Sequence, residues 1–337
     1  MSEYDKIDAL LIGLALGDAH GMPFEMLNRA DVKKHKKNSN YDLNNNFFVE
    51  IPDFHFLKRD LKKAEITDDT ILASHLGRYL VENKGRINKE DYFSSLGQFI
   101  DEQKLITKGV IGPSTGRAVT KIRRNEKFTT SERAGFSNGL ALKSAVLAYF
   151  LPLEEQKSNL EKIEALAYYS HFTDAAISAA AGVYAALAEA LTGGNLEQIF
   201  ASALDYMEQG ENYGLQTFQP SSYQRTKFLL EYISDLNKTE ALNFIAEVMG
   251  TGINSYESVP AAFAVFKLFP ESADKAFAAA VDLGGDTDST AAITGALIGA
   301  HNGMGIFNKS WIKELNQVNS LSLKELGRSL FELRKNK

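Results

Sequence analysis

Apolar residues recur three and four positions apart along most of the chain, which is the spacing of one face of an α-helix. Alternation typical of strands is nearly absent, and Gly, Pro, Asn or Asp bounds most of the periodic segments. The pattern therefore predicts an all-α fold. The expected helices cover residues 5–18, 69–83, 89–104, 115–124, 138–149, 159–169, 174–191, 195–208, 222–233, 238–248, 258–268, 272–282, 288–301 and 322–334.

One long stretch, residues 27–64, lacks this periodicity. It is rich in Asn and Lys but also contains four phenylalanines, at positions 47, 48, 54 and 56. A long irregular segment inside a compact domain is more often a functional flap than a plain linker. Since no shift in composition marks a boundary, we expect a single domain over residues 1–337, with 27–64 as a flap or loop insertion.

Composition narrows the class of protein. The 44% hydrophobic and 24% charged content is that of a globular protein with a large core. The net charge of −6 provides no basic surface for nucleic acid, and the absence of cysteine excludes disulfides and thiolate chemistry. No apolar run approaches the roughly 20 residues needed to cross a bilayer. The N-terminus has no cleavage-like site, so we expect a cytoplasmic protein without a membrane partner.

Two clusters of carboxylates and hydroxyls, TDDT at residues 67–70 and DTDS at 286–289, each open an apolar helix. A single cluster of this kind is typical of a helix N-cap, where one side-chain oxygen accepts hydrogen bonds from free backbone N–H groups. Four carboxylates exceed what two caps require, and hard oxygen ligands suit Mg²⁺, Mn²⁺ or Ca²⁺. The pattern leaves two interpretations open, ordinary caps and a shared metal site.

Other short segments carry candidate chemistry. GLALGDAHGMPFE places Asp18 in what we interpret as a helix C-terminal turn and Glu25 in the loop that follows. The segments GVIGPSTGRAV and GFSNGLALK are Gly/Ser-rich loops that enter helices and can present backbone N–H groups to a phosphate. His171 lies just ahead of another cap-like start, Thr173-Asp174, a position where a lone histidine is often structural.

Taken in order, GLALGDAHGMPFE, ITDDT, GVIGPSTGRAV, SNGLALK, SHFTDAAISAAAG, GTGINSYESVPAAF and GGDTDSTAAITGALIGAHNG resemble the ADP-ribosylglycohydrolase family, which includes the dinitrogenase reductase-activating glycohydrolases. The resemblance covers roughly residues 7–310, and the paired acidic clusters are its most specific part. It implies a compact orthogonal helical domain with a central cleft for two Mg²⁺ or Mn²⁺ ions. The implied activity is release of ADP-ribose from an ADP-ribosylated protein side chain or a related conjugate.

The resemblance also implies roles for individual residues. The matched metal ligands are Thr67, Asp68, Asp69, Asp286, Asp288 and Ser289. The matched substrate-binding residues are Gly112, Gly135, Phe136, Ser137, Asn138, Gly139 and His171. Catalysis is assigned to Glu25, Asp69 and Asp288. This chain departs from the family at Ser289, where Thr is usual, at Lys143, where Arg is usual, and at Ile66, where an aromatic residue often stands.

The chemistry of the proposed reaction agrees with this assignment. Cleavage at C1″ of ribose develops oxocarbenium-like positive charge, which nearby carboxylates stabilise, while two metal ions can align the ribose hydroxyls and acidify a water. Two alternatives remain: a catalytically silent crystallin-like or ADP-ribose-binding member of the family, which loss of metal ligands would signal, and a two-metal phosphoesterase, whose products would be phosphate or AMP.

Overall fold

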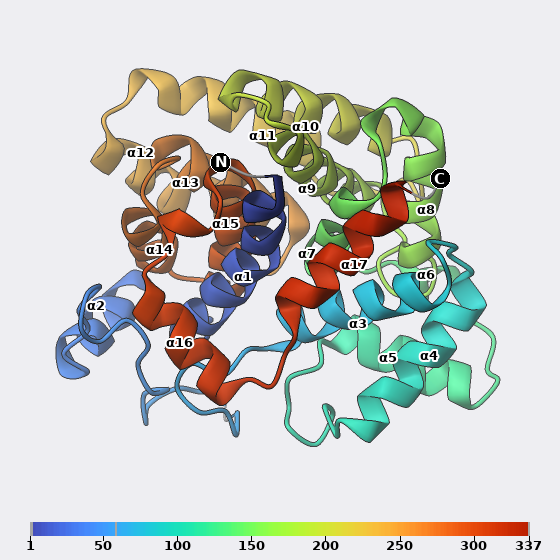
Figure 1. The fold of residues 1–337 in the computed structure, drawn as a ribbon, viewed down its shortest axis with the longest axis horizontal. Helices are drawn as coiled ribbons and strands as arrows, with labels where there is room; N and C mark the ends of the chain where they lie inside the picture. The colour runs from blue at the N-terminus through green and yellow to red at the C-terminus, as the bar shows by residue number, and fades with distance from the viewer. Residues whose placement is uncertain (1–2, 58, 336–337) are drawn as a thin grey trace.

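The computed structural model describes residues 3–57 and 59–335, and within them it contains helices and isolated β-bridges but no strand (Figure 1). The all-α prediction is confirmed, and each predicted helix is present with ends within three residues, two of them finished by a short turn of another helix type. These helices are α1 (Glu3–Gly21), α3 (Asp68–Glu82), α4 (Lys89–Glu102), α5 (Pro113–Arg123), α7 (Gly139–Ser144), α8 (Gln156–Ala167), α9 (Asp174–Thr192), α10 (Leu196–Gly210), α11 (Ser222–Tyr232), α12 (Lys238–Phe244), α13 (Ser255–Leu268), α14 (Ala273–Asp282), α15 (Thr287–Asn302) and α17 (Leu323–Lys335).

Among the described residues, three α-helices are present that periodicity did not predict: α2 (Arg29–Asn38), α6 (Thr130–Arg133) and α16 (Lys309–Val318). The first corrects the expectation that 27–64 is irregular throughout. The α2 helix is strongly polar and has too few apolar residues to show helical periodicity. Asn28 caps it by accepting a hydrogen bond from the Asp31 backbone N–H. Basic residues in its last turn suit the negative end of the helix dipole.

The phenylalanines of 27–64 divide between core and surface. Phe47 and Phe48 are buried, and the Phe47 ring stacks on Trp311 of α16 with ring centroids 3.9 Å apart. Phe54 and Phe56 are exposed, the latter by 64%. The segment is therefore anchored in the core at Phe47 and Phe48, while Phe54 and Phe56 lie at the surface.

The α1 and α15 helices pack against each other near the centre of the molecule (Figure 1), and a seam of glycines lines their contact. A Cβ atom at Gly17 would lie 2.0 Å from the Ala291 carbonyl oxygen, and one at Gly13 would lie 2.1 Å from that of Gly295. Only glycine permits such an approach of two backbones. The seam continues to Gly21, whose carbonyl accepts a hydrogen bond of 2.8 Å from the Thr287 hydroxyl. The end of α1 is thus fixed against the start of α15.

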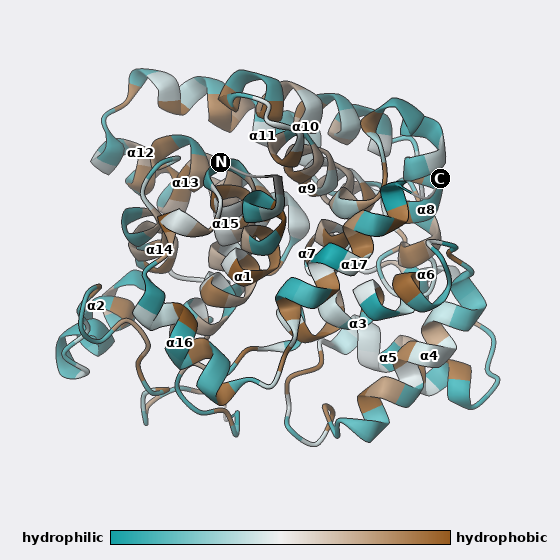
Figure 2. Ribbon diagram, viewed as in Figure 1, coloured by the Kyte–Doolittle hydropathy of each residue, from teal (hydrophilic) through white to brown (hydrophobic). Residues whose placement is uncertain are grey.

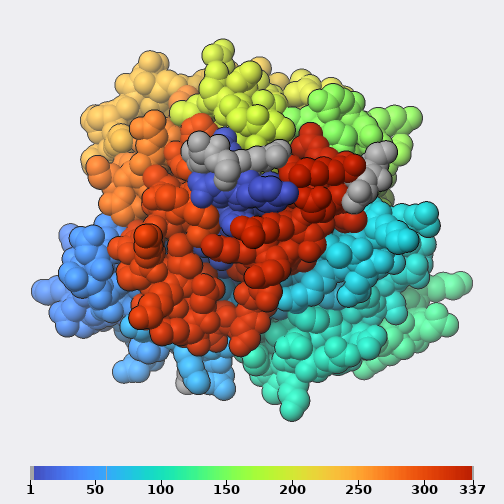
Figure 3. All heavy atoms as spheres, in the orientation of Figure 1, coloured from blue at the N-terminus to red at the C-terminus, as the bar shows by residue number. Residues whose placement is uncertain are grey.

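The core is made of buried apolar residues from most of the helices. Figure 2 shows hydrophobic and hydrophilic positions alternating along the outer helices. The α9 helix is long and apolar enough by composition to span a membrane, but 89% of its apolar window is buried inside the protein, as expected of a core helix. The C-terminal helices cover part of α1 (Figure 3). Arg328 of α17 donates a hydrogen bond of 2.7 Å to Asp8 of α1, which ties the two ends of the chain together.

Candidate active site at the ends of α1, α3 and α15

The acidic start of α15 is held by the backbone. Gly284 and Gly285 adopt positive φ angles of 71° and 76°, and a Cβ atom at Gly285 would lie 2.3 Å from the Thr251 carbonyl oxygen. The Asp286 backbone N–H donates to that same carbonyl at 2.7 Å. Asp286 occupies the N-cap position, yet its side chain makes no capping hydrogen bond. The cap interpretation therefore does not account for this carboxylate.

The start of α3 is capped by residues other than Asp68 and Asp69. The Thr67 hydroxyl accepts a hydrogen bond from the Asp69 N–H at 3.3 Å. The fully buried Asp18 carboxylate of α1 accepts from the backbone N–H groups of Thr67 and Thr70, at 3.0 and 3.1 Å, and from the Thr70 hydroxyl at 2.6 Å. Asp18 is therefore more than part of a helix C-terminal turn, because it positions the start of α3.

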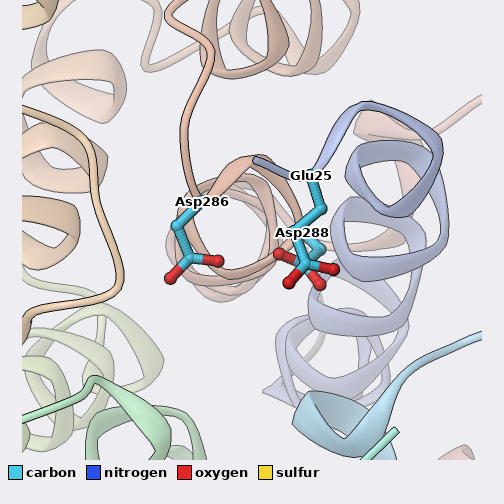
Figure 4. A group of neighbouring side chains, drawn as sticks. All are labelled: Glu25, Asp286 and Asp288. Carbon is cyan, nitrogen blue, oxygen red and sulfur yellow. The ribbon is translucent and has the colours of Figure 1, made fainter. Parts of the chain in front are cut away.

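Glu25 is brought to the same place by a short antiparallel bridge. The Met26 N–H donates to the Gly285 carbonyl at 2.6 Å, and the Gly285 N–H donates to the Leu27 carbonyl at 2.9 Å. Figure 4 shows the carboxylate of Glu25 beside that of Asp288, with Asp286 close by. One carboxylate oxygen from each of these three residues lies within 4.8 Å of the others, and all three residues are buried.

The acidic residues of the site are buried close together, which disfavours the ionised forms of their carboxyl groups. Burial and the neighbouring Asp288 raise the pKa values of Glu25, Asp69 and Asp286 well above those of ordinary carboxyls. Burial likewise raises the pKa of Asp68 to about 6 and that of Asp18 to about 7. A divalent cation among these oxygens would favour their ionised forms, and hard carboxylate oxygens are the ligands that Mg²⁺ and Mn²⁺ accept. The donor set thus fits such an ion.

Arg59 brings a positive charge to the cluster of Glu25, Asp286 and Asp288. The Arg59 guanidinium donates to both carboxylate oxygens of Glu25, with one contact at 2.9 Å, and lies 3.7 Å from Asp288. The Arg59 side chain is only 16% exposed. Sequence analysis did not single out Arg59, because no motif surrounds it and its partners lie far away in the chain.

Neutral polar groups also line the site. The Ser137 hydroxyl lies 2.9 Å from Nε2 of His171, whose Nδ1 lies 2.8 Å from the Ser170 hydroxyl. Burial, with the positive charge of Lys143 nearby, holds the pKa of His171 well below its usual value, so the ring is neutral. The Asn138 side-chain amide donates to Asp286 at 2.6 Å, so a residue expected to contact substrate also orients a carboxylate.

These groups enclose a cavity of about 520 Å³. The structure brings most of the residues predicted from sequence to its wall: Glu25, Asp68, Asp69, Gly112, Ser137, Asn138, Gly139, His171, Asp286, Asp288 and Ser289. Two of them support acidic residues, since the Ser289 hydroxyl donates to Asp69 at 2.7 Å and the Gly112 N–H donates to Asp68 at 3.2 Å.

Three predicted residues do not line the cavity. Thr67 is fully buried as the cap of α3. The Gly135 and Phe136 carbonyls accept hydrogen bonds of 2.9 and 2.8 Å, from the Thr173 hydroxyl and the Ser255 N–H respectively. These contacts hold the loop that presents Ser137 and Asn138.

The fold and the site together define an all-α protein with a carboxylate-rich cavity suited to divalent cations. A model of the ADP-ribosylglycohydrolase family matches residues 1–337, and the chain belongs to that family. Among curated proteins it is 28% identical to the uncharacterized protein YegU of Escherichia coli K12, covering 98% of this chain and 97% of that protein.

Two further similarities extend over nearly the whole chain. An uncharacterized protein of Archaeoglobus fulgidus is 27% identical, with 98% of this chain and 97% of that protein covered. A solved structure described as an ADP-ribosylglycohydrolase-related protein complex superposes with a TM-score of 0.65 at 20% identity, covering 98% of this chain and 99% of that one. At that identity the superposition supports the all-α fold of the family.

Proposed function

We propose that the protein is a metal-dependent hydrolase that releases ADP-ribose from an ADP-ribosylated protein side chain, or from a related conjugate, by cleaving the C1″ glycosidic bond. The observation that carries the proposal is the gathering of Glu25, Asp286 and Asp288 within 4.8 Å of one another at the wall of a 520 Å³ cavity. Membership of the ADP-ribosylglycohydrolase family supports a glycohydrolase type of activity.

The residues would divide the work by position. Water adds to C1″ as the bond from C1″ to the acceptor nitrogen or oxygen breaks; the water loses a proton and the departing atom gains one. Glu25 would accept the water proton, once Arg59 releases its carboxylate. The negative charges of Asp69 and Asp288 would stabilise the positive charge that develops on the ribose.

The carboxylates of Asp68, Asp69, Asp286 and Asp288 would hold two Mg²⁺ or Mn²⁺ ions. Thr67 would support them indirectly, as the cap of the helix that carries Asp68 and Asp69. When bound, such ions supply positive charge that orients the ribose hydroxyls and acidifies water. The Asn138 amide and the Ser289 hydroxyl, which donate to Asp286 and Asp69, would keep those ligands oriented.

The test is an incubation with Mg²⁺ or Mn²⁺ and proteins ADP-ribosylated on defined residues, with the products identified by mass. Free ADP-ribose, absent when the metal is chelated, is the expected product. Phosphate or AMP would instead identify a two-metal phosphoesterase. Binding of ADP-ribose with no product from any conjugate would identify a silent member of the family.

A further inference from the structure

Lys143 combines two properties that rarely occur together. Its side chain is 1% exposed, and its Nζ has no hydrogen-bond partner within the described part of the chain. An unpaired ammonium in a protein interior loses its hydration without compensation, which destabilises the folded state. Buried polar groups in folded proteins are otherwise nearly always satisfied. Lys143 is therefore an unfavourable choice for packing alone.

The position of Lys143 explains what could satisfy it. The residue lies on α7 and lines the same cavity as Ser137, His171 and Asp68. Its neighbours offer little compensation, because His171 is held neutral and the one carboxylate that raises the Lys143 pKa against the effect of burial is Asp68. Asp68 in turn accepts from the Gly112 N–H, and a divalent ion would further engage it. The N–H donors of Lys143 thus have no partner among the described residues, and the cavity that Lys143 lines is the space from which a ligand can supply one.

We propose that Lys143 is a substrate-binding residue that holds an anionic oxygen of the ligand, namely of the diphosphate of ADP-ribose. The inference rests on the proposed function, which supplies the ligand. In ADP-ribose the diphosphate is the anionic part, so a cation in the cavity wall selects for it over uncharged ribosides. A lysine ammonium binds phosphate as a compact point charge.

The proposal predicts opposite effects of one substitution on stability and on binding. Lys143→Met keeps a side chain of similar length without the charge. Because it removes a buried unpaired cation, the melting temperature of the ligand-free protein is expected to rise. A hydrogen bond to a charged group contributes about 1.5–3 kcal/mol, so the dissociation constants of ADP-ribose and ADP are expected to increase by about 10- to 100-fold. Binding of adenosine, which lacks the diphosphate, is expected to stay unchanged.

Two further variants complete the experiment, with calorimetry for the nucleotides and ligand-observed NMR for adenosine. Lys143→Arg restores the charge and is expected to recover much of the lost ADP-ribose binding. Lys121→Met is the matched control, since it removes the same charge from a lysine that is paired with Glu132 and lies outside the cavity. It should leave ADP-ribose binding unchanged and not raise the melting temperature.

The outcomes separate this inference from the proposed function. If the parent protein binds ADP-ribose and Lys143→Met binds it equally well, the assignment of Lys143 is wrong while the proposed function stands. A lower melting temperature with equal losses for ADP-ribose and adenosine would show that Lys143 is structural. If the parent protein binds no ADP-ribose, the proposed function and the role of Lys143 fall together.

Discussion

Arg59 competes with a divalent ion for the carboxylates of Glu25 and Asp288. Its guanidinium occupies the space beside Glu25 and Asp288, whose carboxylate oxygens are also candidate metal ligands. Metal binding then requires Arg59 to leave or the carboxylates to be shared. Substitution of Arg59 by Met, which keeps the aliphatic stem and removes the charge, is expected to increase the affinity for Mg²⁺ and Mn²⁺.

The size of the effect follows from the contacts. At the 3.7 Å separation of Arg59 and Asp288, two unit charges interact by about 4–5 kcal/mol at an effective dielectric constant of about 20. Much of this is offset by desolvation, and hydrogen bonds to charged groups contribute a net of about 1.5–3 kcal/mol. At about 1.4 kcal/mol per factor of ten, removal of Arg59 should strengthen metal binding by about 10- to 100-fold.

Calorimetric titration of each metal into the apoprotein measures this affinity directly. The control is Arg124→Met, which removes the same charge from a side chain that is 69% exposed and pairs with Glu126 at 3.8 Å. In chelator, Arg59→Met should also melt at a lower temperature than the parent, because the buried Glu25 loses its counter-charge. Metal binding by Arg59→Met that is equal to or weaker than that of the parent would refute the competition and show instead that Arg59 holds Glu25 in place for the ion.

Three other predictions concern the remaining groups of the site. Asp288→Asn should lower metal affinity and turnover together by about tenfold or more, as for other losses around a metal ion, and unchanged affinity would remove Asp288 from the ligands. Asn138→Ala should weaken metal binding a few-fold as well as ADP-ribose binding, because Asp286 loses the amide that orients it; calorimetry with each ligand checks this. The raised pKa values of Asp68, about 6, and Asp18, about 7, mean that the folded protein holds protons that the unfolded chain releases. In chelator its melting temperature should therefore fall as the pH rises from about 4 to about 7. A melting temperature that does not change with pH would argue against these raised pKa values.

The sequence was sufficient for most of the helices because their apolar spacing is regular and their ends carry caps. The α2 helix escaped prediction because Val32 and His35 are its only buried residues, too few to make a periodic pattern. In 27–64, the phenylalanine count did not reveal that Phe47 would stack on Trp311, a contact across more than half of the chain.

The acidic clusters could be found from sequence because each opens a helix and contains more carboxylates than a cap needs. Arg59 and Lys143 could not be assigned roles in the same way, since a single basic residue in a loop or on a helix has no distinguishing local pattern. Their roles depend on which carboxylates and cavities the fold brings beside them. Asp18 was noticed, but its function became visible only when its three donors from the start of α3 were in place.

The glycine seam between α1 and α15 bears on how the protein could be engineered or could diverge. The backbone of Glu25 is placed against the aspartates of α15 by two backbones in contact, through the glycine seam and the bridge between Leu27 and Gly285. Residues at the rim, such as Phe56 and Ile253, can therefore be randomised in a library to seek new conjugates without disturbing the acidic centre. Gly13 lies about 12 Å along the helix from Gly21, at a rise of about 1.5 Å per residue. A methyl group added there would nevertheless push α1 away from α15 and displace the acidic centre in every variant of that library.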